Sequence, residues 1–549
     1  MTTAFRQSVR RTAGVALVAL LCLAAGRAPL AGRAPARQTL AARIDAIVNR
    51  PLYRHGAFGI AFLSLDTGTL IYARNADQLF TPASTTKLLT EGTALHLLGA
   101  DYRFHTRVYR TGPIAPDGTL RGDLVLVASG DPDLSNRIRP DGTLAFENED
   151  HAYDGSPDTK AVPGDPLMVI RQLAAQVAAH GVKRIDGRVL VDASLFPEGG
   201  RELGTGTTLS PVVLNDNVID VTLTPAATAG QPAVMHVSPD TAYAQFTDAV
   251  TTGTAGSTVG VTFDHDVAHE DGSHSVMVSG SMPAGGPPIL FAYRVKAPSR
   301  FAAMAFAQAL QERGIAALAA PPDAKPDFAA LAASYTPDAV VAEHVSPPLA
   351  EEVKVTLKVS QNLHASLTPY LLGALVAHAK KDIEQAGFDQ EHAFLAQAGL
   401  DLTGASQGDG AGGALSAFFT PEFMVHYLAF MAKQPEFAVF ERALPILGRD
   451  GTLWDIETGS PAAGHVHAKT GTFAAFNNLN RSLLLTAKGL AGYMTTADGR
   501  HLAFAIYANR VPLPREDDPL KVEKQIDQVG QALGEIAAAA YETPGRLSH

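Results

Sequence analysis

Ser84 and Lys87 are the residues whose types and spacing first suggest chemistry in this chain. They lie three positions apart, just where an apolar, helix-forming run from 87 to 98 begins. Residues at i and i+3 share one face of a helix. The amine could take the serine proton, and the free N–H groups of a helix start favour an oxyanion. The same spacing also fits a helix cap beside a solvated lysine.

Two later motifs supply the other groups that acyl transfer to serine requires. Ser360-Gln361-Asn362 precedes a predicted helix, and Lys469-Thr470-Gly471-Thr472 lies on a predicted strand. The reaction needs a base, a proton path to the leaving amine, donors for the oxyanion and a cation for a substrate carboxylate. The three motifs together can provide all four.

Four side chains are the predicted catalytic residues. Ser84 would be the nucleophile and Lys87 its base, with a pKa lowered by burial and by a neighbouring cation such as Lys469. Ser360 could relay the proton. Asn362 could hold Lys87 and the carbonyl of the substrate peptide in place.

The strand motif is the predicted substrate-binding element. Lys469 and Thr470 would bind a terminal carboxylate, and Gly471 would keep the strand edge bare for the substrate backbone. The backbone N–H groups of Ser84 and Thr472 are the candidate oxyanion hole.

The order Ser-x-x-Lys, Ser-x-Asn, Lys-Thr-Gly resembles that of the penicillin-binding proteins and serine β-lactamases. Ser84 and Ser360 are 276 residues apart, far more than in a compact β-lactamase, whereas Ser360 and Lys469 are 109 apart. The chain is thus similar to the low-molecular-mass class C penicillin-binding proteins, the D-alanyl-D-alanine carboxypeptidases/endopeptidases of peptidase family S13. Other stretches similar to that family follow in order: Gly122-Asp123-Leu124, Gly130-Asp131-Pro132, Ser346-Pro347-Pro348-Leu349, Asp409-Gly410 with Leu415-Ser416, and Leu444-Pro445 with Asp450-Gly451-Thr452-Leu453.

This resemblance implies a fold, a reaction and its partners. The fold would be α/β (α+β): a penicillin-binding/β-lactamase-like transpeptidase domain with a large, mainly β inserted region. The activity would be that of a serine hydrolase, a D,D-carboxypeptidase/endopeptidase. It would act on D-Ala-containing peptidoglycan peptides and cell-wall cross-links through an acyl-enzyme on Ser84. β-Lactams would inhibit it, and no metal or cofactor would be needed.

The chain departs from the family pattern at three places. Gln361 replaces the usual aspartate, with a side chain expected to point away from the site. Residues 409–416 loosen an Asp-Gly-Ser-Gly-Leu-Ser stretch, and residues 473–488 extend a hairpin that is tight in the family. These departures bear on substrate preference more than on chemistry.

The predicted elements suggest how the chain is divided. A helix at 36–49 and a hairpin at 59–73, with its turn at Asp66-Thr67-Gly68, lead to Ser84. Short β-like runs follow from about 107. We expect a signal peptide at 1–31, a first catalytic part at 36–106, an inserted β-rich part at 107–296 and a second catalytic part at 297–549.

The N-terminal residues predict export. Arginines 6, 10 and 11 precede a short apolar run and then small residues, the order of a signal peptide. Thirteen apolar or small residues are too few for a spanning helix, which needs roughly 20. Arg10-Arg11 fits a twin-arginine signal poorly, so a general secretory route to the periplasm is expected. The product would be soluble or peripherally membrane-associated.

Composition excludes several classes. The single cysteine, Cys22, lies in the signal run without a lipoprotein context, so the mature chain would lack disulfides and thiolate sites. Without the five arginines of residues 1–33 the formal charge moves from −11 to about −16. An acidic protein of this kind is a poor partner for nucleic acid. The oligomeric state stays open.

Several other patterns are set aside. Acidic residues and histidines crowd at 264–274 without a sharp metal-ligand spacing, and a solvated loop explains them. Residues 404–408 match a nucleophile elbow and 408–413 a dinucleotide loop, but neither has the required strand and helix around it. His364, His465 and His467 are expected to be ordinary packed or surface residues, and Trp454 is expected to lie in the core.

Two alternative functions stay open. The first is another acyl-serine enzyme on the same fold, a β-lactamase or an esterase. The second is a non-catalytic module that senses β-lactams or binds the wall. Turnover of a penicillin label on Ser84 would favour the first, and absence of D-alanine release would favour the second.

Overall fold

Five antiparallel strands form the sheet beside which the three motifs meet. The computed structural model describes residues 38–321 and 326–543. The strand order is β17-β18-β19-β1-β2. Their bounds are β1 (Ala57–Ser64), β2 (Leu70–Arg74), β17 (Val466–Asn477), β18 (Ser482–Thr495) and β19 (His501–Pro512).

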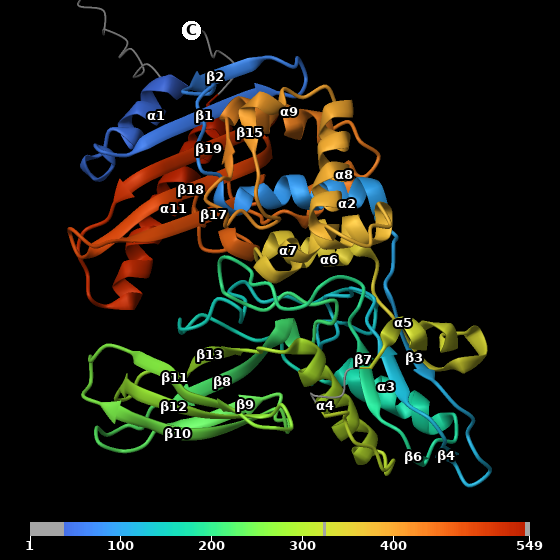
Figure 1. The fold of residues 1–549 in the computed structure, drawn as a ribbon. Coiled ribbons are helices and arrows are strands. Elements are labelled where there is room, and N and C mark those ends of the chain that lie inside the picture. The colour runs from blue at the N-terminus through green and yellow to red at the C-terminus, as the bar shows by residue number, and fades with distance from the viewer. Residues whose placement is uncertain (1–37, 322–325, 544–549) are drawn as a thin grey trace, which may run out of the picture. The chain divides into compact units, whose positions relative to one another are not determined.

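The sheet is covered on both faces, as its apolar strands require. Seven of the eight positions of β1 are buried, which is typical of a central strand with no solvent face. The first and last helices, α1 (Leu40–Val48) and α11 (Pro519–Glu542), pack against one face and against each other. Figure 1 shows them together on that side of the sheet.

A helical layer on the other face carries two of the three motifs. Its core joins α2 and α9 to the inward side chains of β1, β18 and β19. The helices of this layer are α2 (Lys87–Leu98), α6 (Leu349–Lys358), α7 (Asn362–Leu371), α8 (Ile383–Gln397), α9 (Pro421–Met431) and α10 (Phe437–Ala443).

The inserted region begins with a four-stranded sheet in the order β14-β3-β5-β7. Helices α3 (Met168–Ala179) and α4 (Pro298–Glu312) share one apolar core with this sheet. The strands are β3 (His105–Arg110), β5 (Leu124–Val127), β7 (Val189–Asp192) and β14 (Val340–Val345).

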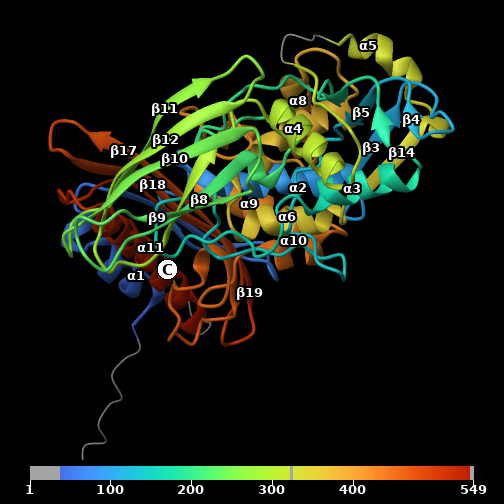
Figure 2. The same ribbon diagram turned by 90° about the horizontal axis from the view of Figure 1, so that it is seen from below.

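Two three-stranded sheets complete the inserted region, in the orders β13-β8-β9 and β10-β12-β11. A small apolar core joins them, and Figure 2 shows them from below. Their strands are β8 (Val218–Thr224), β9 (Val234–Ser238), β10 (Ala244–Gly253), β11 (Gly260–Ala268), β12 (His274–Pro283) and β13 (Ile289–Arg294). Short elements elsewhere are β4 (Thr119–Leu120), β6 (Arg184–Ile185), α5 (Phe328–Leu331), β15 (Ala405–Ser406) and β16 (Phe418–Phe419).

The structure confirms the expected fold class and most of the expected elements. The first helix, the hairpin and the helix after Ser84 are present. A helix expected at 366–383 instead begins at Asn362, passes into a π-helical turn at Leu372–Val376 and ends before α8. No helix among residues 38–321 and 326–543 is long and apolar enough to cross a membrane. The predicted signal peptide at 1–31 lies outside the described residues.

Packing bears on where the inserted region ends. The sequence suggested residue 296, but α4 packs on α3 and β14 pairs with β3. The backbone then enters α6, whose apolar residues belong to the core of the helical layer. We therefore propose a boundary near residue 346 and keep the rest of the division as a proposal.

Candidate active site

Ser84 lies on a single 3-10 turn, Ala83–Thr86, that leads directly into α2. Lys87 is the first residue of α2 and is fully buried. Its Nζ lies 2.8 Å from the Ser84 Oγ. The predicted pair is therefore in hydrogen-bond contact, and a neutral Lys87 amine could accept the hydroxyl proton.

The Lys87 ammonium is held by two further acceptors. The Oδ1 of Asn362 lies 2.6 Å away and the carbonyl of Ala411 lies 3.1 Å away. Asn362 comes from the first turn of α7, as the second motif predicted. The Ala411 carbonyl was not predicted, because it belongs to the loop that the sequence only identified as rich in turns.

Burial lowers the pKa of Lys87 to about 8, even though the carboxylates of Glu202, Asp409 and Glu91 raise it. We predicted that Lys469 would contribute to this lowering, and that attribution was wrong. The repulsion instead falls on Lys469, whose pKa is held well below its usual value by burial, then by Lys87 and Lys488. Burial therefore disfavours the charged form of both amines.

Ser360 joins the second motif to the third. Its Oγ accepts a hydrogen bond from the Lys469 Nζ at 2.8 Å, and the same Nζ donates to the Thr470 carbonyl at 2.9 Å. Lys469 is fully buried and Ser360 nearly so. Hydroxyl and amine groups from all three motifs therefore lie in one connected set, with Lys87 bound to Ser84 and Lys469 bound to Ser360.

The backbone of Ser360 is strained, and the inserted region supports it. Its φ is 62°, in the left-handed region that non-glycine residues rarely adopt. The Tyr153 hydroxyl donates to the Ser360 carbonyl at 2.5 Å. Strain of this kind persists only where the surroundings fix it. Sequence reasoning missed Tyr153, which carries no motif and lies 207 residues away in sequence.

Gln361 points away from Ser84, as predicted. Its Oε1 accepts from the N–H of Leu363 at 2.9 Å and so caps α7. Its Nε2 donates to Asp150 of the inserted region at 3.2 Å. The residue between Ser360 and Asn362 therefore anchors their backbone rather than reaching the nucleophile.

Strand β17 presents an open edge of the sheet beside Ser84. We expected Gly471 to keep that edge bare for a substrate. Instead, the space beside Gly471 is filled by the backbone of the turn that carries Ser84. A Cβ at Gly471 would lie 2.5 Å from the Pro82 carbonyl oxygen and 3.1 Å from the Ser84 nitrogen. Glycine is thus required for the strand to approach the nucleophile turn. The neighbouring Thr470 hydroxyl bonds to that of Thr452 at 2.7 Å.

Both regions line the cavity at this site, which has a volume of about 710 Å³. Ser84, Ser360, Asn362, Thr470 and Thr472 line it from the three motifs. Tyr153, Leu203 and Gly204 line it from the inserted region. Part of the wall around the nucleophile is therefore supplied by the inserted segment.

The segments set aside in the sequence have ordinary roles or positions. The 404–413 loop packs beside α2, where the Gly410 carbonyl accepts from Thr90 at 2.9 Å. The 264–274 segment lies on β11 and β12, where Asp266 pairs with His274 at 2.6 Å. His465 stacks on Tyr541. His364 is different, because it is fully buried among carboxylates.

A serine in contact with a buried lysine at the start of a helix, beside an edge strand carrying Lys-Thr-Gly, is typical of a serine peptidase with a penicillin-binding-protein fold. The model of the D-Ala-D-Ala carboxypeptidase 3 (S13) family matches residues 40–533. The chain belongs to this family.

Relatives and solved structures agree with this family. The D-alanyl-D-alanine carboxypeptidase of Actinomadura sp. (strain R39) is 28% identical over 97% of this chain and 92% of its own length. The D-alanyl-D-alanine carboxypeptidase DacB of Haemophilus influenzae is 24% identical over 82% of this chain and 85% of its own. The crystal structure of penicillin binding protein 4 (dacB) from H. influenzae matches with a TM-score of 0.66 and 20% identity. It covers 91% of this chain and 99% of the other.

Proposed function

We propose that this protein is a D,D-carboxypeptidase/endopeptidase that removes or cleaves beside D-alanine in peptidoglycan peptides, through an acyl-enzyme on Ser84. The observation that carries the proposal is the contact of the Ser84 Oγ with the buried Lys87 amine at 2.8 Å. Membership of the S13 family supports the substrate class. The proposal assigns no catalytic role to a metal or cofactor.

In acylation, the neutral Lys87 amine takes the hydroxyl proton as the Ser84 Oγ attacks the carbonyl of the scissile bond. Burial supports this role, since it lowers the pKa of Lys87 to about 8 and so populates the neutral amine near physiological pH. The N–H groups of Ser84 and Thr472 would bind the developing oxyanion. The scissile C–N bond then breaks, and the acyl group stays on the Ser84 Oγ as an ester.

Ser360 would pass a proton to the leaving amine, which departs with D-alanine. Its contact with the Lys469 Nζ supports this relay. Asn362 would hold Lys87 and the substrate carbonyl, while Lys469, Thr470 and the bare position of Gly471 would receive the substrate's terminal carboxylate and backbone along the edge of β17. Water then attacks the acyl-enzyme, with Lys87 again available as base.

β-Lactams are proposed inhibitors and the periplasm the proposed location. A neighbour of similar fold, penicillin binding protein 4 of H. influenzae, is described in complex with a β-lactam. A β-lactam acylates a serine of this kind without releasing its leaving group, so hydrolysis of the acyl bond would be slow. The signal-like N-terminus supports export to the compartment where peptidoglycan lies.

The decisive experiment digests purified peptidoglycan with the wild-type enzyme and with Ser84→Ala, and resolves the products by mass. Loss of terminal D-alanine alone means carboxypeptidase action, and shortened cross-links mean endopeptidase action. Ser84→Ala should produce neither. Intact substrate after incubation with a folded wild-type enzyme would refute the proposal.

A fluorescent penicillin separates the two rival functions in a parallel assay. We expect a label that stays on Ser84 for many minutes. Turnover within seconds to minutes would point to a β-lactamase. Stable labelling without D-alanine release from a pentapeptide would point to a β-lactam-sensing module.

A further inference from the structure

A group of buried acids and one histidine lies where the inserted region meets α6 and α7, outside the cavity at Ser84. Asp133 follows β5, Glu352 belongs to α6 and His364 to α7. One ligand atom from each lies within 4.8 Å of the others. The Asp133 side chain is 2% exposed and that of His364 is 0%. Water is thus almost excluded from all three groups.

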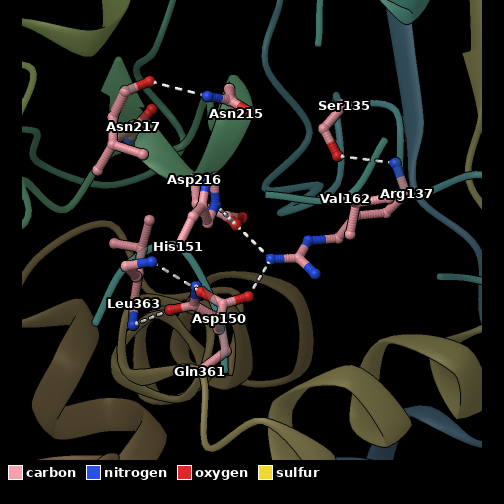
Figure 3. A network of polar contacts seen from close by, with 12 residues as sticks. Ser135, Arg137, Asp150, His151, Val162, Asn215, Asp216, Asn217, Gln361 and Leu363 are labelled. Atoms are coloured by element: carbon pink, nitrogen blue, oxygen red, sulfur yellow. Dashed lines mark hydrogen bonds and ion pairs between the residues drawn. The ribbon is translucent and has the colours of Figure 1, made fainter. Parts of the chain in front are cut away.

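In the part of the chain that the structure describes, three of the four carboxylate oxygens of Asp133 and Glu352 lack donors, while the Glu352 Oε1 accepts from the Thr356 hydroxyl at 3.2 Å. Within residues 38–321 and 326–543, no hydrogen-bond donor reaches either oxygen of Asp133 or the Oε2 of Glu352. Arg137 lies near, with its Nε 3.9 Å from Asp133. Its guanidinium is committed elsewhere, however, because it binds Asp150 at 2.5 Å and Asp216 at 2.6 Å (Figure 3).

His364 has the arrangement expected of a metal ligand. Its Nε2 bonds to the Asp216 carboxylate at 2.8 Å. Its Nδ1 lies 2.8 Å from the Glu352 Oε1 but makes no hydrogen bond. In metal sites, a ligating histidine almost always donates its second N–H to a carboxylate, which fixes the tautomer and orients the ring. Asp216 would have that role here.

Unpaired buried carboxylates are unfavourable unless a cation or a proton neutralises them. Both oxygens of Asp133 and the Oε2 of Glu352 are buried and, among the described residues, unpaired in this way. Either the Asp133 carboxyl is protonated and shares that proton with Glu352, or a cation binds between them. A single shared proton can serve only one of the two unpaired Asp133 oxygens, whereas a cation can bind beside both, and this favours the cation.

We propose that Asp133, Glu352 and His364 bind one divalent transition-metal cation, Zn²⁺ or Mn²⁺. Two carboxylates and one imidazole are a ligand set that suits these ions, with remaining positions available to water. The ion would be structural. It would tie the 130–134 segment of the inserted region to α6 and to α7, the helix that begins at Asn362. The proposal does not rest on the peptidase function.

The test uses the full mature enzyme, purified without an affinity tag of histidines and without chelator. Elemental analysis by mass spectrometry should find about one Zn²⁺ or Mn²⁺ per chain. Removal of the ion by chelation should lower the Tm by several degrees, and adding the same ion back should restore it. Cobalt(II) in its place should show the visible absorption of a nitrogen-ligated ion.

Variants locate the ion. Asp133→Asn with Glu352→Gln should abolish stoichiometric binding, and Asp133→Asn alone should weaken it more than about tenfold. Asp266→Asn is the matched control, because it also removes a partly buried carboxylate that pairs with a histidine, His274. It should keep the full metal content. If the double variant does not fold, the metal affinity of Asp133→Asn and the cobalt(II) spectrum of the wild-type enzyme test the proposed ligands instead.

Two results would overturn the proposal. One is a wild-type enzyme that binds neither Zn²⁺ nor Mn²⁺ at micromolar concentration, either as purified or after chelation and re-addition, which would mean that a proton occupies the cluster. The other is binding of unchanged affinity in Asp133→Asn, which would place the ion elsewhere. Penicillin labelling of Ser84, measured in parallel, reports on the catalytic proposal separately.

Discussion

Buried cations in the catalytic region and in the inserted region face different partners. Lys87 and Lys469 lie beside Ser84 and Ser360 with neutral acceptors around their amines, and burial lowers both pKa values. Arg137 of the inserted region instead contacts Asp150 and Asp216 directly, and these carboxylates keep it charged. A buried amine without a carboxylate partner can gain and lose a proton. A guanidinium paired with carboxylates stays charged and can only stabilise the structure around it. We infer from this difference that the inserted region stabilises the structure around the site, whereas the chemistry is carried out by groups of the catalytic region.

The largest effect should come from the reacting amine. Lys87→Met keeps the volume of the side chain but removes the base, so the rate of Ser84 labelling by a fluorescent penicillin should fall at least about a thousandfold. Lys354→Met on α6 is the control and should label normally. Labelling of Lys87→Met at a rate close to wild type would remove the distinction between the two regions.

A cavity in the inserted core should destabilise that region first. Phe306 of α4 is fully buried there, and Phe306→Ala should lower the free energy of unfolding by about 3–5 kcal/mol. Hydrogen exchange should rise in α3 and β5. Phe504→Ala, in the core beneath α1 and α11, should instead raise exchange in β1 and β19. An equal rise in hydrogen exchange in both regions of Phe306→Ala would argue against our boundary near residue 346.

Support by the inserted region should be measurable at Tyr153. Tyr153→Phe removes the donor to the Ser360 carbonyl and should reduce kcat/KM about tenfold, or about 1.4 kcal/mol, with little change in Tm. Tyr335→Phe is the control, because its hydroxyl makes a similar bond at 2.8 Å to Asp192 within the inserted region. If both variants behave alike, Tyr153 has no special part in positioning Ser360.

The smallest effect should be a shift in pH dependence. Only the neutral Lys87 amine accepts a proton, so labelling should rise with pH and level off above about pH 8. The Glu202 carboxylate raises the pKa of Lys87, and Glu202→Gln should therefore move the rise to lower pH. Glu198→Gln, whose carboxylate accepts from Ser210 and Ser299, should leave the profile in place. A profile that does not move in Glu202→Gln would show that this acid of the inserted region does not influence the base.

The proposed reacting groups could be located in the sequence because each motif is short and its residues lie on one local element. Ser84 and Lys87 share a turn, and Ser360 and Asn362 flank a helix start. The order and the residue types of the three motifs were enough to identify these groups as candidates. That the structure brings these groups into contact follows from packing over hundreds of residues, which the motifs themselves do not encode.

The supporting groups were not predictable in the same way. Tyr153, Glu202 and the Ala411 carbonyl lie in loops without a pattern, and their partners are more than 100 residues away. His364 was dismissed as an ordinary packed residue, since one histidine on an apolar helix gives no sign of the carboxylates that surround it. Our proposed boundary near residue 346 differs from the 296 expected from sequence, because the amphipathic pattern of α4 does not show which core the helix joins.

The pairing of β1 with β19 bears on how the molecule is made. Ala57 to Ser64 pair with Leu502 to Asn509. The interior strand β1 therefore has no partner on this side until the ribosome has added more than 400 further residues. Pairings so distant in sequence form slowly. A chain interrupted before β19 would leave an almost wholly apolar strand without its neighbour, a target for chaperones and proteases. This side of β1 is therefore paired only in a chain that extends through β19.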